Sequence, residues 1–235
     1  MAKIYGLFGA MTGKVADVVM VVRNGAQIAR KYQPIVSNPS SPAQVAARAR
    51  LKLLSQLAAV VGRGLGFRRS GLVSARNQFV RANYPASSYD NSKASIAMLS
   101  LDLSGGSISI PNVTTPPRAS NILEYSLATS PQPIDGVIYC IIEKGNDNEF
   151  AFAHSEVVTE KGNDGHYGSS VSFISSAVGG YIYAYGFRFL SSRARALYEN
   201  LVAENSNGVL DVIRSVDESE LELTRTTAVA FSAVN

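Results

Sequence analysis

The chain has 235 residues, of which 46% are hydrophobic and 17% charged, a composition that excludes a disordered protein and allows a sizeable core. Its single cysteine, Cys140, excludes an internal disulfide, and no apolar run approaches the roughly 20 residues that span a bilayer. Residues 1–81 carry thirteen basic residues against one acid, a net +12, whereas the remainder carries nine against seventeen, a net −8.

Residues 15–32 are predicted to form a β-hairpin. The β-prone segments 15–23 and 26–32 flank Asn24-Gly25, a pair that supplies both positive-φ positions of a type I′ turn. The preceding segment 9–14 is glycine-rich and ends in lysine, but its glycine spacing is not that of a phosphate-binding loop, and Val15 replaces the required Ser or Thr. We therefore expect a glycine-rich turn without a phosphate site.

Two helices are predicted next. Ser41 is a suitable N-cap, with Pro42 at the first helical position, and the helix should run to about Val61 before Gly62 or Gly64. Its expected apolar face consists of Ala47, Leu51, Leu54, Ala58 and Val61. A shorter helix is expected over 71–83, closed by Pro85.

Residues 86–95 are polar and form the predicted domain boundary. Beyond them the apolar period changes to two, which predicts strands at 96–103, 107–111, 121–128, 136–143, 149–153, 169–174, 180–190 and 226–234. A helix over 191–205 interrupts this series. In the strand 180–190, alternation should place Tyr181, Tyr183 and Tyr185 on one face and Ile182 and Ala184 on the other.

The predicted fold is mainly β, α+β overall. A basic hairpin-and-helix assembly region, 1–90, precedes an acidic domain, 96–235, that forms an antiparallel Ig-like β-sandwich with a helical insertion. Because the region 1–90 holds one hairpin and two short helices and repels itself, we expect it not to fold stably without a partner surface or the rest of the chain.

No residue pattern predicts catalysis, a cofactor or a metal site. His154 and His166 lack neighbouring ligands at zinc spacing, and Cys140 lies in an apolar run typical of a buried thiol. The repeated Glu-Lys-Gly-Asn-Asp segments, 143–147 and 160–164, fit hairpin tips, since the ligand spacing of a calcium loop is absent. The acidic run 217–222 fits a strand with one solvated face.

The charge asymmetry predicts that the first third binds a polyanion or an acidic protein surface. The predicted binding residues are its basic side chains: Lys14, Arg23, Arg30, Lys31, Arg48, Arg50, Lys52, Arg63, Arg68 and Arg69. Contacts from several of these to phosphates would give affinity independent of base sequence. Two alternatives stay open: these residues form a solvated helix face, or they pair with the acidic second domain.

Several motifs of the first third carry a resemblance to known proteins: Gly6-Leu-Phe-Gly-Ala-Met-Thr-Gly-Lys-Val15, Val18-Val19, Arg30-Lys-Tyr-Gln-Pro34, Asn38-Pro-Ser-Ser-Pro-Ala-Gln44 with Arg48, Ser74-Ala-Arg-Asn-Gln-Phe-Val80 and Asn83-Tyr-Pro85. Over residues 3–90 the chain resembles a family of Bacteroidota proteins that occurs in chromosomes, phages and prophages. That family has no established activity, so the resemblance implies no catalytic residues. The helix start at Asn38 is also similar to one in phage virion-associated proteins.

These observations favour a non-enzymatic phage structural or virion-associated protein. Its basic N-terminal region would dock on a capsid, a neighbouring subunit or packaged nucleic acid, and the chain is expected to be a homo-oligomer without a membrane span. It would be made in the cytoplasm of the bacterial host and reside in the virion. The alternatives are a cytoplasmic nucleic-acid-binding protein that uses the same arm, or a carbohydrate- or surface-binding β module.

Overall fold

A computed structural model describes residues 2–3, 13–23, 26–33, 40–67, 73–116, 122–128, 133–144, 150–172, 179–204 and 216–232. Two compact units make up the chain, Met1–Val45 and Ala46–Asn235. We call them the N-terminal unit and the body. The composition of residues 86–95 suggested a boundary there, but these residues lie inside the body.

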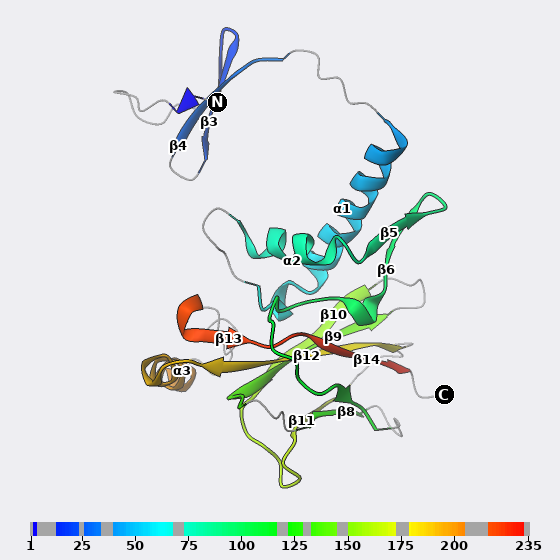
Figure 1. The fold of residues 1–235 in the computed structure, drawn as a ribbon, viewed down its shortest axis with the longest axis vertical. Helices are drawn as coiled ribbons and strands as arrows, with labels where there is room; N and C mark the ends of the chain where they lie inside the picture. Colours follow the sequence, from blue (N-terminus) through cyan, green and yellow to red (C-terminus); the bar gives the residue numbers. More distant parts are fainter. Residues whose placement is uncertain are drawn as a thin grey trace. The chain divides into compact units, whose positions relative to one another are not determined.

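The N-terminal unit is a four-stranded antiparallel sheet with the strand order β1-β4-β3-β2 (Figure 1). Its strands are β1 (Ala2–Lys3), β2 (Gly13–Val15), β3 (Val18–Arg23) and β4 (Ala26–Lys31). The predicted hairpin is confirmed as β3 and β4, in a register that pairs Arg23 with Ala26. Its first strand was predicted too long, because Ala16 adopts a positive φ of 49° and forms a turn between β2 and β3.

Both predicted helices are present. Helix α1 (Pro42–Val60) begins after Ser41 and is followed by the 3-10 turn η1 (Gly62–Gly64). Helix α2 (Ala75–Asn83) begins later than predicted, because the Ser74 hydroxyl accepts a hydrogen bond from the backbone N–H of Asn77, at 3.2 Å, and caps it there.

The buried side of α1 is turned from the predicted one. Leu54, Ala58 and Val61 are buried as expected, but Leu57 is buried with them and Leu51 is 45% exposed. The prediction for Leu51 was therefore wrong. Leu57 explains the difference. Around the helix, Leu54 lies between Leu57 and Leu51, so a buried stripe that includes Leu57 is centred away from Leu51.

The body contains two antiparallel sheets and a hairpin. The five-stranded sheet has the order β10-β9-β12, and both β13 and β14 pair with the other edge of β12. Its strands are β9 (Gly136–Lys144), β10 (Phe150–Val158), β12 (Gly179–Phe189), β13 (Leu221–Leu223) and β14 (Thr227–Ser232). The three-stranded sheet, in the order β11-β8-β7, consists of β7 (Val113–Thr114), β8 (Ile122–Leu127) and β11 (Tyr167–Ser172).

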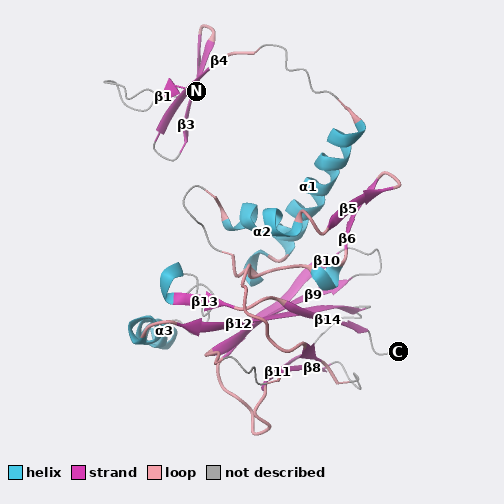
Figure 2. Cartoon of the chain, in the orientation of Figure 1, coloured by secondary structure: helices cyan, strands magenta, loops and turns pink. Residues whose placement is uncertain are grey.

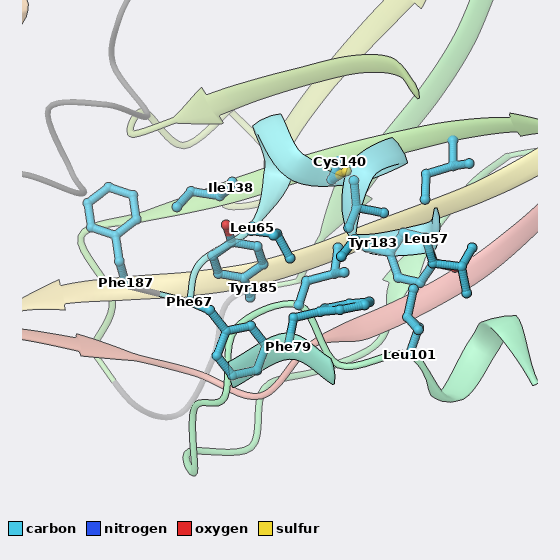
Figure 3. Close-up of a cluster of buried hydrophobic side chains, with 14 of the residues drawn as sticks. Leu57, Leu65, Phe67, Phe79, Leu101, Ile138, Cys140, Tyr183, Tyr185 and Phe187 are labelled. Carbon is cyan, nitrogen blue, oxygen red and sulfur yellow. The ribbon is translucent and has the colours of Figure 1, made fainter. Parts of the chain in front are cut away.

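The five-stranded sheet lies between two hydrophobic clusters. On one side it packs against α1 and α2, and on the other against the three-stranded sheet (Figure 2). Strand β12 alternates as predicted: Tyr183 and Tyr185 belong to the helix-side cluster, whereas Ile182 and Ala184 belong to the other. Figure 3 shows Tyr183 and Tyr185 together with Leu57 and Phe79 in the helix-side cluster. The mainly β, α+β prediction is confirmed.

The body has three layers, helices, sheet and sheet. Two antiparallel sheets from the predicted sandwich region pack face to face, an Ig-like arrangement of their strands is not confirmed, and α1 and α2 add the third layer. The helices cover the face of the five-stranded sheet that carries Ile138, Cys140 and Ile142. Helix α3 (Ser192–Glu204) confirms the predicted insertion, and the Ser191 hydroxyl caps it by accepting a hydrogen bond from the backbone N–H of Ala194, at 3.0 Å.

Several expected strands are wrong. Residues 87–96 form a hairpin of β5 (Ser87–Asp90) and β6 (Lys93–Ile96), and the 3-10 turn η2 (Met98–Ser100) follows it. Residues 107–111 contribute a single bridge, from Ile108 to Thr224. The acidic run 217–222 was expected as a strand with one solvated face. It instead forms the 3-10 turn η3 (Glu218–Glu220), and only Leu221 and Glu222 of the run belong to a strand, β13.

A polar network joins three distant parts of the body. The buried Asn83 side chain donates to the backbone carbonyls of Phe79, at 3.0 Å, and Asp102, at 2.8 Å. The Asp102 carboxylate accepts from the backbone N–H of Ser104, at 3.1 Å, and from the Thr226 hydroxyl, at 3.0 Å. These bonds fix the segment after η2 between α2 and the start of β14.

Buried tyrosines attach neighbouring segments to the five-stranded sheet. Tyr183 donates from its hydroxyl to the carbonyl of Met98, at 3.0 Å, and Tyr185 donates to the carbonyl of Gly64, at 2.9 Å. Burial, the largest cause, raises the pKa of Tyr125, Tyr139 and Tyr183 well above the ordinary value of 10.0.

The raised tyrosine pKa values predict alkaline unfolding. A group whose pKa is higher in the folded than in the unfolded protein stabilises the fold fully below its unfolded pKa and loses that contribution as pH rises. Stability should therefore fall above about pH 10, the unfolded tyrosine pKa. In an alkaline titration, the last tyrosinate absorbance should appear together with loss of the far-UV circular dichroism. Full ionisation of all tyrosines with an intact spectrum would contradict this.

Candidate functional site

One face of the N-terminal sheet combines basic and aliphatic side chains. In the register of β2, β3 and β4, Lys14 pairs with Val19, and Val19 pairs with Arg30. Directly paired residues of an antiparallel sheet point to the same side. The pair two residues further along, Val21 with Ile28, points to that side too. We call this the basic face; it consists of Lys14, Val19, Val21, Ile28, Arg30 and the adjoining Tyr32.

Among the described residues, neither Lys14 nor Arg30 of the basic face forms an ion pair. Lys14 and Arg30 are exposed, and the Lys14 ammonium nitrogen Nζ lies 3.6 Å from the centre of the Tyr32 ring. Asp17, the single acid among residues 1–81, lies in the turn after β2, where its carbonyl accepts from the backbone N–H of Tyr32, at 2.6 Å. The face therefore presents positive charge around an aliphatic centre.

The N-terminal unit has no buried side chain among those described in it. Val21 is 42% exposed on the basic face, and Val18 is 36% exposed on the opposite face, where Met20 and Ala29 are half-buried. A sheet of this size normally covers one of its faces. Lys31 is exposed on the opposite face, so it does not belong to the basic face.

The basic residues of α1 separate into two groups. Arg48 and Lys52 are exposed one turn apart, with the half-exposed Leu51 beside them. Arg50 instead makes contacts inside the body. Its guanidinium donates to the Ser87 hydroxyl, at 2.9 Å, and to the Tyr84 carbonyl, at 2.5 Å, and it lies 3.9 Å from the centre of the Tyr84 ring. Arg50 is therefore a structural residue of the body, and we leave it out of the candidate surface.

The other predicted binding residues are placed only in part. Arg23 lies in β3 and Arg63 in η1, and their side chains are outside the described part of the chain. Arg68 and Arg69 lie outside the described residues altogether. The side chains that the structure brings together in one surface are thus Lys14 and Arg30, joined by the aliphatic residues that sequence reasoning did not single out. The alternation of side chains along the two hairpin strands could have identified these aliphatic residues, because it places them on the same side as Arg30.

Catalytic and metal chemistry finds little support in the described residues. His154 Nε2 lies 3.6 Å from the Glu156 carboxylate, and His166 Nδ1 lies 3.5 Å from that of Asp164. Within the described ranges, no three His, Cys, Asp or Glu side chains form a group that could hold a metal ion. Cys140 is buried in the helix-side cluster.

The outer face of the three-stranded sheet carries a groove with a volume of about 660 Å³. Glu124 and Asp164 contribute its carboxylates, and the described residues that line it include no Lys or Arg. Thr114, Ser126 and Ser170 add hydroxyl groups. We call it the acidic groove, and it is the part of the body that matches the charge of the basic face.

No protein-family model, curated protein or solved structure matches the chain. Among the helices in the described ranges, none has both the length and the apolar character needed to cross a bilayer.

Proposed function

We propose that this chain is a non-enzymatic assembly protein of a phage particle, in which the N-terminal unit binds an acidic surface. One observation carries the proposal. The basic face joins exposed cations to the exposed Val21 and the half-buried Val19 and Ile28, in a unit whose described side chains are all at least partly exposed. The resemblance of residues 3–90 to phage and prophage proteins supports the place of that assembly, the virion.

The exposed apolar side chains of the N-terminal sheet provide the physical argument for a partner. A small sheet gains most of its stability when an apolar face is covered, and the N-terminal sheet leaves Val18 and Val21 more than a third exposed. A partner that covers the basic face would bury the aliphatic centre and pair the surrounding cations, the usual arrangement of a protein interface. Exposed and unpaired, each of those cations contributes almost nothing to stability.

A nucleic-acid-binding protein is the second candidate. Tyr32 lies on the basic face with Lys14 and Arg30, and cations next to an aromatic ring suit a single strand. An acidic protein surface is favoured, because phosphates make no use of the aliphatic pair Val21 and Ile28 beside the cations.

The test changes the charge of the basic face alone. The variant Lys14→Gln with Arg30→Gln should lose incorporation into particles by at least about tenfold, since each charge pair in a partly desolvated interface is worth about 1 kcal/mol or more. A matched variant, Lys93→Gln with Arg193→Gln, removes two exposed cations from the body and should be incorporated normally.

Binding to random-sequence double-stranded and single-stranded DNA is measured in parallel. Absence of DNA binding in the unaltered chain, with loss of incorporation in the first variant, supports the assembly role. Salt-dependent DNA binding that the first variant abolishes, with normal incorporation, would favour the second candidate instead.

A further inference from the structure

We propose that the partner of the basic face is a second copy of this chain, bound through its acidic groove. The inference rests on the proposed function and names the partner of the same surface. It follows from matching two described surfaces of opposite charge, one in the N-terminal unit and one in the body.

Charge complementarity is the first argument. Residues 1–81 carry a net +12 and the remainder a net −8, so a neighbouring copy supplies the counter-charge that the first third lacks. The basic face contributes Lys14 and Arg30, and the acidic groove contributes Glu124 and Asp164, with no Lys or Arg among the described residues of its lining. Opposed in this way, the two surfaces attract each other at long range and in contact.

The second argument is that both surfaces combine charged with aliphatic side chains. Both are faces of antiparallel sheets. Glu124 lies on the outer face of β8 with Ile122, which is 45% exposed, so this face also joins an aliphatic side chain to its charge. The hydroxyls of Thr114 and Ser126 line the same groove and can accept hydrogen bonds from a lysine or arginine. Val21 and Ile28 of one copy would then be covered by the sheet of the next.

The contact must be head-to-tail. Two basic faces placed against each other would oppose Lys14 and Arg30 with their own copies, and like charges facing each other are unfavourable. An interface between two different surfaces closes if two copies each bind the other's groove, and otherwise continues into a ring or a filament. This is an assembly suited to a repeating particle component.

Sedimentation velocity of the full chain tests the proposal. At low ionic strength the chain should form dimers and larger species, and these should dissociate as salt shortens the Debye length from about 10 Å at 0.1 M to about 3 Å at 1 M. The basic-face variant Lys14→Glu with Arg30→Glu, and the groove variant Glu124→Lys with Asp164→Lys, should each weaken self-association at least tenfold, which is about 1.4 kcal/mol. The variant Lys93→Glu with Arg193→Glu is the matched control and should associate normally.

Mixing the two weakened variants is the decisive step. Each keeps one intact surface, and the two altered surfaces are also opposite in charge, so the mixture should associate again although each variant alone does not. Circular dichroism of each variant checks that these exposed substitutions leave the fold intact. A monomeric chain at low salt, association that neither variant weakens, or a mixture that stays monomeric would each overturn the proposal.

The outcomes separate this inference from the proposed function. A chain that stays monomeric at low salt, yet loses particle incorporation when Lys14 and Arg30 are changed, retains the assembly role and assigns the basic face to another acidic protein. A chain that self-associates as described but is never incorporated into particles keeps the head-to-tail contact and loses the phage role.

Discussion

A fragment of residues 46–235 should unfold cooperatively, whereas a fragment of residues 96–235 should not form a stable native core. The shorter fragment lacks six large side chains that are buried in the whole chain: Leu54, Leu57, Val61, Leu65, Phe67 and Phe79. Their loss would leave Ile138, Tyr183 and Tyr185 facing water on the helix side of the five-stranded sheet.

The size of this effect follows from the burial. Covering a side chain of this kind is worth about 2 kcal/mol, so six of them are comparable with the whole net stability of a domain, about 5–15 kcal/mol. Thermal unfolding followed by circular dichroism, with dye binding to exposed apolar surface, distinguishes the two fragments. A sharp transition in the fragment 96–235, near that of the fragment 46–235, would contradict the three-layer description of the body.

The substitution Gly106→Ala should destabilise the body by about 3 kcal/mol or more, at the upper end of what overpacking costs. A Cβ atom at Gly106 would lie 2.3 Å from the backbone carbonyl oxygens of both Leu223 and Thr224. Backbone atoms cannot rotate away as a side chain does, so the segment of Gly106 would have to separate from the end of β13.

The matched control is Gly62→Ala. A Cβ atom at Gly62 meets nothing within 4 Å, so this variant should unfold at nearly the same urea concentration as the unaltered chain. Urea midpoints with unchanged slopes give both values. Equal midpoints for the two variants would mean that the segment of Gly106 moves easily, and would contradict the close contact with β13.

The sequence predicted the elements whose signals are local. The hairpin β3 and β4 follows from Asn-Gly between two β-prone segments, α1 from Ser41-Pro42, and the two-sided burial of β12 from strict alternation around Tyr183. Each of these depends on neighbours in sequence, which is why pattern and structure agree.

The errors come from contacts between distant residues. Leu51 fits an amphipathic face, but the buried stripe of α1 is decided by which side meets β9 and β12, and Leu57 meets them. Residues 86–95 have the composition of a linker, yet Asn91 and Ser92 have positive φ values of 48° and 64° and turn the chain into a hairpin. The same limit applies to the candidate site, since charge counting named Arg50 but could not show its bonds to Ser87 and Tyr84.

The bond from Thr226 to Asp102 has a consequence for the order in which the protein matures during synthesis. The two residues are 124 positions apart, so a ribosome adding about 5–20 residues per second needs roughly 6–25 s to supply the partner of Asp102. Strand β14, which completes the edge of β12, arrives after that. The described pairings of the N-terminal sheet, by contrast, all lie within residues 2–31. All residues of the surface that we assign to binding are therefore synthesised, and open to a partner, while the body that follows is still unfinished.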